Sequence, residues 1–235
     1  MRKENISYWT KSAKIDDFPK LSESIETDRL VIGGGIAGIL TAHALASINR
    51  KVILIDGRKL AQETTANTTA KITAQHGPIF QTYLDSYGED KARLIYDSQI
   101  DGINHIAELE ERYDIYCDFE RLSSFLVTNS ECFESLQKEK EAYDLLRIPH
   151  NVQETGIDLP VENTYALEIP NQAQFNPIKF LAHMVNTLSE LENGQAGIFM
   201  VDGNLRAIYK DNSGQKHETG AVCTHMGYIV NFNDD

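Results

Sequence analysis

Three glycines, Gly33, Gly35 and Gly38, stand in the GxGxxG spacing within the string VIGGGIAGILTAHAL. In this motif the first glycine permits a tight turn, the second lets the backbone approach a pyrophosphate, and the third lets a helix pack against a strand. Ile36 and Ala37 begin the expected helix, where free amide groups and the helix dipole attract phosphate. The string predicts a dinucleotide site, and the alternative is a glycine-rich turn that binds nothing.

Two strands and a helix must position these glycines. The apolar runs 28–34 and 51–56 predict strands buried on both faces of a parallel sheet. Asp56 ends the second run, where a carboxylate can accept hydrogen bonds from a ribose diol. A helix is expected over residues 36–49, and its buried stripe is predicted to be Ile36, Ile39, Leu40, Ala44 and Leu45. The fold class is therefore α/β.

A threonine-rich segment, GRKLAQETTANTTAKITAQHG, follows Asp56. Short hydroxyl side chains can donate hydrogen bonds to a ligand without filling its pocket, and the local cations could face phosphate. The candidate ligand-binding residues are Arg58, Thr65, Thr69 and Lys71. The alternative is an ordinary loop that leads into a strand over residues 71–75. His76 ends the segment, and a structural role is favoured for it over a catalytic one.

Composition restricts the classes of function. The formal net charge is -13 and the pI is near 5.0, which argues against nucleic acid and anionic membrane surfaces as partners. No apolar run is long enough to span a bilayer, and the first residues lack the apolar core of a secretory signal. The three cysteines are scattered, which favours a reducing, cytoplasmic setting. Cys117 and Cys132 are expected to be small buried hydrophobes.

The other expected elements can be stated briefly. Residues 1–26 form a polar arm that is either loose or anchored by Trp9, Phe18 and Leu21. Helices are predicted over residues 79–87, 89–113 and 130–148, with two strands within 115–128 and an extended run over 165–169. Asn176 is expected to cap a helix that starts at Pro177 and runs to Leu191.

The character of the chain changes after Glu192. Residues 197–235 predict short antiparallel strands, with tight turns at Asp202-Gly203 and Asp211 to Gly214. This pattern differs from the α/β pattern before it. A domain boundary is therefore expected between Glu192 and Gly197.

With these motifs in place, residues 27–192 resemble a partial FAD-binding, Rossmann-like domain of the D-amino-acid-oxidase/glycine-oxidase superfamily of oxidoreductases. The likeness rests on DRLVIGGGIAGILTAHAL, Asp56, TTAKITAQHG and AQFNPIKFL. The branch most similar to this chain carries a C-terminal Rieske [2Fe-2S] domain. Residues 197–235 resemble part of such a domain, in which the string CTHMG supplies Cys223 and His225 as metal ligands.

The resemblance implies a flavin that takes a hydride from a small amine or amino-acid-like donor, with an iron–sulfur centre passing electrons to a partner. FAD would lie on Gly33 to Gly38 and Asp56, with Thr65, Thr69 and Lys71 near the flavin. The sequence departs from the family in two respects. A Rieske centre needs two cysteines and two histidines as ligands, whereas this segment supplies one of each. In addition, Tyr228 stands where the family commonly has another cysteine.

The oxidoreductase part is also short, so we expect an internally deleted or truncated form with weak or absent FAD retention, no cluster and a tendency to aggregate. Two other hypotheses stay open. One is an NAD(P)-dependent dehydrogenase, and the other is a non-catalytic remnant that binds an ADP-containing ligand or nothing. No catalytic residue is assigned.

Overall fold

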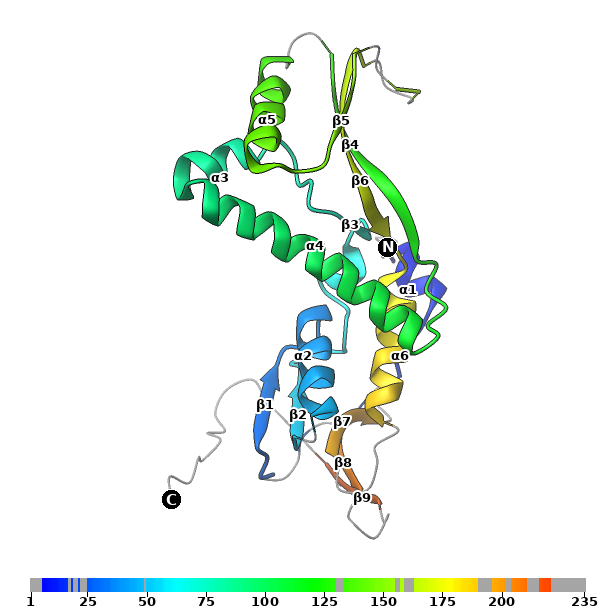
Figure 1. Cartoon of the computed structure of the whole chain (residues 1–235). Helices are drawn as coiled ribbons and strands as arrows, with labels where there is room; N and C mark the ends of the chain where they lie inside the picture. The colour runs from blue at the N-terminus through cyan, green and yellow to red at the C-terminus, as the bar shows by residue number, and fades with distance from the viewer. Residues whose placement is uncertain are drawn as a thin grey trace. The chain divides into compact units, whose positions relative to one another are not determined.

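The computed structural model describes residues 6–16, 18, 21, 25–48, 50–129, 133–154, 157–158, 163–189, 196–201, 204–210 and 216–220. The chain forms two compact units (Figure 1). The first unit comprises Met1–Thr69 and Asn176–Asp235, and the second comprises Ala70–Phe175. This division differs from the one expected from the sequence, because the second unit is an insertion within the first.

The first unit contains the predicted parallel βαβ element. Strand β1 (Arg29–Ile32) pairs in parallel with β2 (Val52–Ile55), and helix α2 (Ile36–Ser47) connects them. Burial on both faces holds for β2 but is wrong for β1, in which Ile32 is 76% exposed. Both strands are edges of this two-stranded sheet, but β2 also lies against strand β7 (Ala196–Val201), which covers it further.

The predicted buried stripe of α2 is confirmed at Ile39 and wrong at its other positions. The buried residues are Ile39, Ala42, His43 and Ala46, whereas Ile36, Leu40 and Leu45 are half-buried and Ala44 is exposed. Almost every position in this helix is apolar or small, so the sequence pattern does not distinguish its faces. The buried face is set instead by β2 on one side and by helix α6 (Pro177–Ser189) on the other.

The N-terminal residues are anchored within the first unit. Helix α1 (Tyr8–Ser12) places Trp9 so that its indole Nε1 donates to the Thr68 carbonyl oxygen at 2.8 Å. Phe18 is 3% exposed. Asn176 caps α6 as predicted, because its Oδ1 accepts from the Lys179 amide at 3.1 Å, and its Nδ2 donates to Ser12 Oγ at 2.8 Å.

The predicted antiparallel strands after residue 192 are confirmed. They are β7 (Ala196–Val201), β8 (Asn204–Lys210) and β9 (Lys216–Gly220). Val201 lies opposite Asn204 and Lys210 opposite Lys216, as two tight connections require. The residues of both predicted turns lie outside the described ranges.

The second unit is an antiparallel sheet covered by helices. Strand β6 (Tyr165–Gln174) is central; it pairs with β4 (Glu120–Thr128) along one edge and with β3 (Lys71–Ile72) and β5 (Asn151–Gln153) along the other. Residues 115–128 thus contain one strand, not the two predicted, and β3 is shorter than expected. Both differences arise because strand lengths follow the pairing with β6, which the local sequence does not specify.

Three helices of the second unit agree with the prediction: α3 (Phe80–Tyr87), α4 (Glu89–Arg112) and α5 (Phe133–Leu146). Figure 1 shows α3 and α5 on the same side of the β4–β6 ribbon. The apolar side chains of these three helices and of β6 form one core, which includes the fully buried Phe80, Tyr143 and Leu167. Within the described ranges, no helix is long and apolar enough to cross a membrane.

Candidate nucleotide site

The glycine turn between β1 and α2 is tightly closed. Gly33 has a φ of +108°, which L side chains rarely adopt. A Cβ on residue 38 would lie 1.7 Å from the Gly33 carbonyl oxygen, so only glycine allows α2 to begin this close to the turn. These two positions have the roles that the motif predicts for them.

Gly34 is a third position at which a side chain would clash, and it is not one of the three motif glycines. A Cβ there would lie 2.1 Å from Leu60 Cδ2 and 3.2 Å from Asp56 Cβ. The Gly34 carbonyl also accepts from the Ala61 amide at 2.8 Å. The run of three consecutive glycines was the available signal, but the partner loop at Leu60 and Ala61 is visible only in the fold.

Asp56 braces this turn. Its Oδ2 accepts from the Gly34 amide at 2.7 Å, and its Oδ1 accepts from the Arg58 amide at 2.7 Å. The carboxylate is half-buried. Because each carboxylate oxygen can accept more than one hydrogen bond, Asp56 keeps capacity for ligand hydroxyls while it fixes the backbone.

The first turn of α2 leaves amide groups open. Among the described residues, the amides of Gly35, Ala37 and Gly38 have no hydrogen-bond acceptor, and the N-cap, Gly35, supplies no capping side chain. The Ile36 amide donates to Thr65 Oγ1 at 3.3 Å. Several unpaired N–H groups at the positive end of a helix dipole form an anion site.

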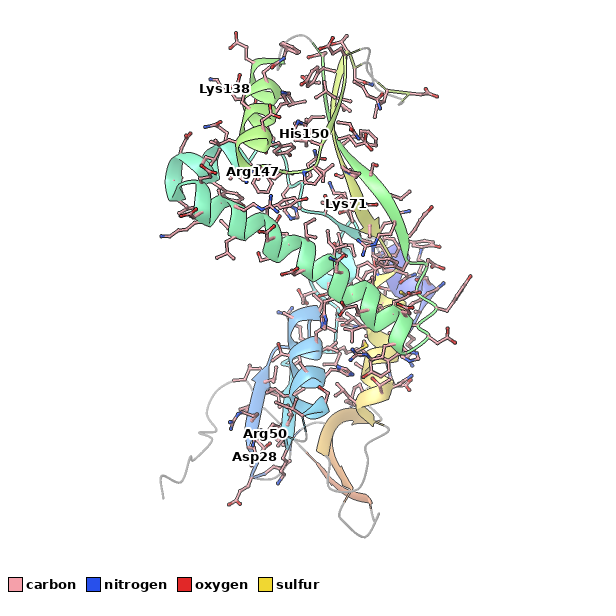
Figure 2. All side chains as sticks on the ribbon, viewed as in Figure 1. Asp28, Arg50, Lys71, Lys138, Arg147 and His150 are labelled. Atoms are coloured by element: carbon pink, nitrogen blue, oxygen red, sulfur yellow. The ribbon has the colours of Figure 1, made fainter. Side chains whose placement is uncertain are left out.

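The other predicted ligand residues differ in their position and in their exposure to solvent. Thr65 lies beside the glycine turn, since a Cβ on residue 35 would be 3.3 Å from its Oγ1. Arg58 pairs with Glu63 at 2.6 Å, and both side chains are largely exposed. Thr69 is exposed. Lys71 belongs to the second unit, on β3 (Figure 2).

His76 also lies in the second unit, just after β3. Partial desolvation, together with the nearby Lys71, lowers the pKa of His76. No described residue of the second unit donates a hydrogen bond to its ring or accepts one from it. The neutral imidazole is thus favoured at this position.

No group of three or more potential metal ligands occurs among the described residues. Cys223, His225, Tyr228 and Cys132 lie outside the described ranges. Cys117 is fully buried, and desolvation raises the pKa of its thiol to about 11, with smaller contributions from nearby carboxylates. Its prediction as a small buried hydrophobe is confirmed.

A βαβ turn with this glycine spacing and an acid after the second strand is typical of nucleotide-binding α/β proteins. The sequence pattern of the FAD dependent oxidoreductase (DAO) family matches residues 28–207, so the chain belongs to that family. The match continues through β7 into β8, across the boundary expected between Glu192 and Gly197.

Two curated relatives are similar to this chain. The first, YhfW of Bacillus subtilis, is provisionally named as a Rieske 2Fe-2S iron-sulfur protein and is 34% identical over 183 residues, which is 77% of this chain and 36% of the relative. The second, gamma-glutamylputrescine oxidoreductase of Escherichia coli, is 28% identical over 61% of this chain and 34% of the relative. The chain thus spans about a third of the length of each.

Solved structures show the same fold. L-Amino acid deaminase from Proteus myxofaciens has a TM-score of 0.58 and 14% identity, and the likeness covers 83% of this chain and 45% of that one. L-Proline dehydrogenase from P. horikoshii has a TM-score of 0.50 and 18% identity, over 87% and 52% of the two chains. The predicted α/β fold class is thereby confirmed.

Proposed function

We propose that this chain binds FAD and takes part in the oxidation of a small amine or amino-acid-like donor. The observation that carries the proposal is the set of unpaired amides on Gly35, Ala37 and Gly38, above a glycine turn braced by Asp56. Family membership supports the cofactor. The names of two similar proteins, a gamma-glutamylputrescine oxidoreductase and an L-amino acid deaminase, support the class of donor.

The residues of the first unit fit the nucleotide half of FAD. The open amides would hold the pyrophosphate, and Gly35 leaves room for it because it carries no side chain. Asp56 would accept hydrogen bonds from the ribose diol with its remaining lone pairs. FAD, when bound, supplies the hydride acceptor, and the protein contributes binding, orientation and electrostatics.

Thr65 has a separate role in this arrangement. Its hydroxyl lies 3.3 Å from the Ile36 amide and next to Gly35, so it borders the space above the first turn of α2. A hydroxyl can donate to a phosphate oxygen while its own oxygen accepts from the amide. We expect Thr65 to strengthen anion binding, with Arg58 and Thr69 adding weaker, exposed contacts.

The residues present supply only part of the ligand set of an iron–sulfur relay. Cys223 and His225 are one cysteine and one histidine, whereas a Rieske cluster needs two of each. These two donors alone do not hold the cluster.

The first test is a visible absorption spectrum of the purified full chain after addition of FAD and gel filtration. If the chain binds FAD as proposed, and not with the weak retention that its short oxidoreductase part predicts, a flavin band elutes with the protein. That band should bleach under anaerobic conditions when an amine or amino acid is added. Reoxidation by O₂ or by ferricyanide would then identify the class of acceptor.

The same preparation tests the two alternatives. A ligand that binds only the native state raises the unfolding temperature, so FAD should protect the chain more than NAD or NADP does. Protection by NAD alone would favour the dehydrogenase hypothesis. If neither cofactor raises the unfolding temperature and the protein aggregates, the glycine turn is inherited from the family but no longer binds a cofactor.

A further inference from the structure

The sheet of the second unit has one face that packs on helices. In a row across the sheet, Leu126 of β4, Leu167 of β6 and Val152 of β5 lie opposite one another, and all three belong to or pack against the helix-covered core. Successive side chains of a strand point to opposite faces. The next row along the strands therefore points away from the helices.

That next row consists of Phe125, Glu168 and Asn151. Glu168 is central, since Phe125 is its direct partner on β4 and Asn151 its direct partner on β5. Side chains at such paired positions have Cβ atoms about 5 Å apart and contact one another. Phe125 and Glu168 are half-buried, and Asn151 is exposed.

Both oxygens of the Glu168 carboxylate are held in place. Oε1 accepts from the Ser123 hydroxyl, and Oε2 accepts from Asn151 Nδ2 at 3.1 Å. Each oxygen keeps a further lone pair, because a carboxylate has about four acceptor positions. The group is thus an oriented negative charge with unused acceptor capacity.

A β-bulge gives Ser123 its position. Leu122 pairs with Gln172 and Ser124 with Ile169, so Pro170 and Asn171 of β6 face Ser123 alone. Asn171 has a φ of +58°, and proline is tolerated in a central strand only at such an irregularity. Bulges re-aim side chains and occur often beside functional sites.

Glu168 has no cationic partner within the described residues. The ion pairs there involve Arg58, Arg93, Lys140, His105 and His150, and none reaches Glu168. A carboxylate that is half-buried, oriented by two hydrogen bonds and left without a cation complements a small positively charged ligand. The Phe125 ring beside it can add a cation–π contact.

We propose that Glu168 and Phe125 bind the ammonium group of a small aliphatic amine on this face of the sheet. Glu168 accepts hydrogen bonds from the ammonium, and Phe125 contacts its charge and its alkyl carbons. This inference deepens the proposed function, on which it rests for the amine's role as hydride donor, by assigning the residues that select an amine.

The test is an NMR titration of the full chain with butylamine at neutral pH, followed through the side-chain amide signal of Asn151. Butan-1-ol and butyrate serve as neutral and anionic controls. We expect saturable shifts with butylamine only. Glu168→Gln should weaken binding at least tenfold, because it removes the negative charge that the ammonium group pairs with.

Phe125→Leu keeps the apolar volume but removes the aromatic face, and it should weaken binding about three- to fivefold. The matched control is Glu120→Gln. Glu120 is an exposed carboxylate on the same strand, β4, that also accepts from a neighbouring amide, Gln174 Nε2 at 3.1 Å. Its removal should leave butylamine binding unchanged.

Three results would overturn the inference: no butylamine binding by the wild-type chain, equal binding of butan-1-ol, or equal binding by the Glu168→Gln variant. Flavin absorbance in the same samples separates this inference from the proposed function. Flavin binding without amine binding refutes the ammonium site alone, and Glu168-dependent amine binding without flavin refutes the FAD proposal alone.

Discussion

The carbonyl oxygen of Gly33 occupies the space that a Cβ on Gly38 would need, at 1.7 Å from the ideal Cβ position. The contact is with backbone, so no side-chain rotation relieves it. Either α2 moves away from β1 or the turn opens. Both the nucleotide site and the packing of the first unit thus depend on the absence of a Cβ at residue 38.

Gly38→Ala should therefore destabilise the chain and abolish FAD binding. We expect a loss of about 2–3 kcal/mol in the free energy of unfolding, as in overpacked cores. Urea denaturation and the flavin absorbance of the purified variant measure the two effects. The matched control is Gly102→Ala in α4, where a Cβ meets nothing within 4 Å. That change should stabilise the helix by about 0.5–1 kcal/mol.

Asp56→Ala should weaken both the turn and the cofactor site. It leaves the amides of Gly34 and Arg58 without their 2.7 Å acceptors, at an expected cost of about 1–3 kcal/mol. FAD affinity should fall at least tenfold in a fluorescence titration. Glu63→Gln removes only the exposed pair with Arg58 and should change stability by about 0.5 kcal/mol or less. Equal effects of the two substitutions would contradict the role given to Asp56.

Glu139 predicts a pH dependence of stability in the second unit. Its carboxylate is fully buried and accepts from the Phe80 amide at 2.9 Å and from the Gln81 amide at 3.1 Å, at the start of α3. Desolvation outweighs these hydrogen bonds and raises the pKa of Glu139 above its ordinary value of 4.5. The folded state therefore binds the proton more tightly than the unfolded chain does.

As a result, the contribution of Glu139 to the free energy of unfolding falls as pH rises from about 4.5 through the raised pKa. Glu139→Gln cannot ionise, so the stability of the wild type relative to this variant should decline from pH 5 to pH 8. Urea denaturation across that range measures the difference. Glu141→Gln on the exposed side of α5 is the control and should show no such trend. A pH-independent difference for Glu139→Gln would refute the assignment.

Cys117 should be unreactive in the folded chain. Its thiol is fully buried, and its pKa of about 11 keeps it protonated at neutral pH. Iodoacetamide treatment followed by peptide mass spectrometry should find Cys117 unmodified in the native protein and modified in urea. Labelling of Cys117 at a similar rate in both conditions would show that the packing around β4 is not as described.

The sequence alone predicted those features that a few neighbouring residues determine. The spacing of Gly33, Gly35 and Gly38 predicts the turn because backbone stereochemistry there admits little else. Asn176 before Pro177 predicts the start of α6 for a similarly local reason. Helical periodicity likewise predicted α3, α4 and α5 within a few residues of their observed ends.

The tertiary structure decided everything that depends on contacts between distant residues. The buried face of α2 follows from β2 and α6, because the helix is apolar all round and could have packed on either side. The packing of Leu60 against Gly34, and the row formed by Phe125, Glu168 and Asn151, depend on strand register and loop placement. Register is fixed by the sum of packing energies over a whole sheet, which no local pattern in the sequence expresses.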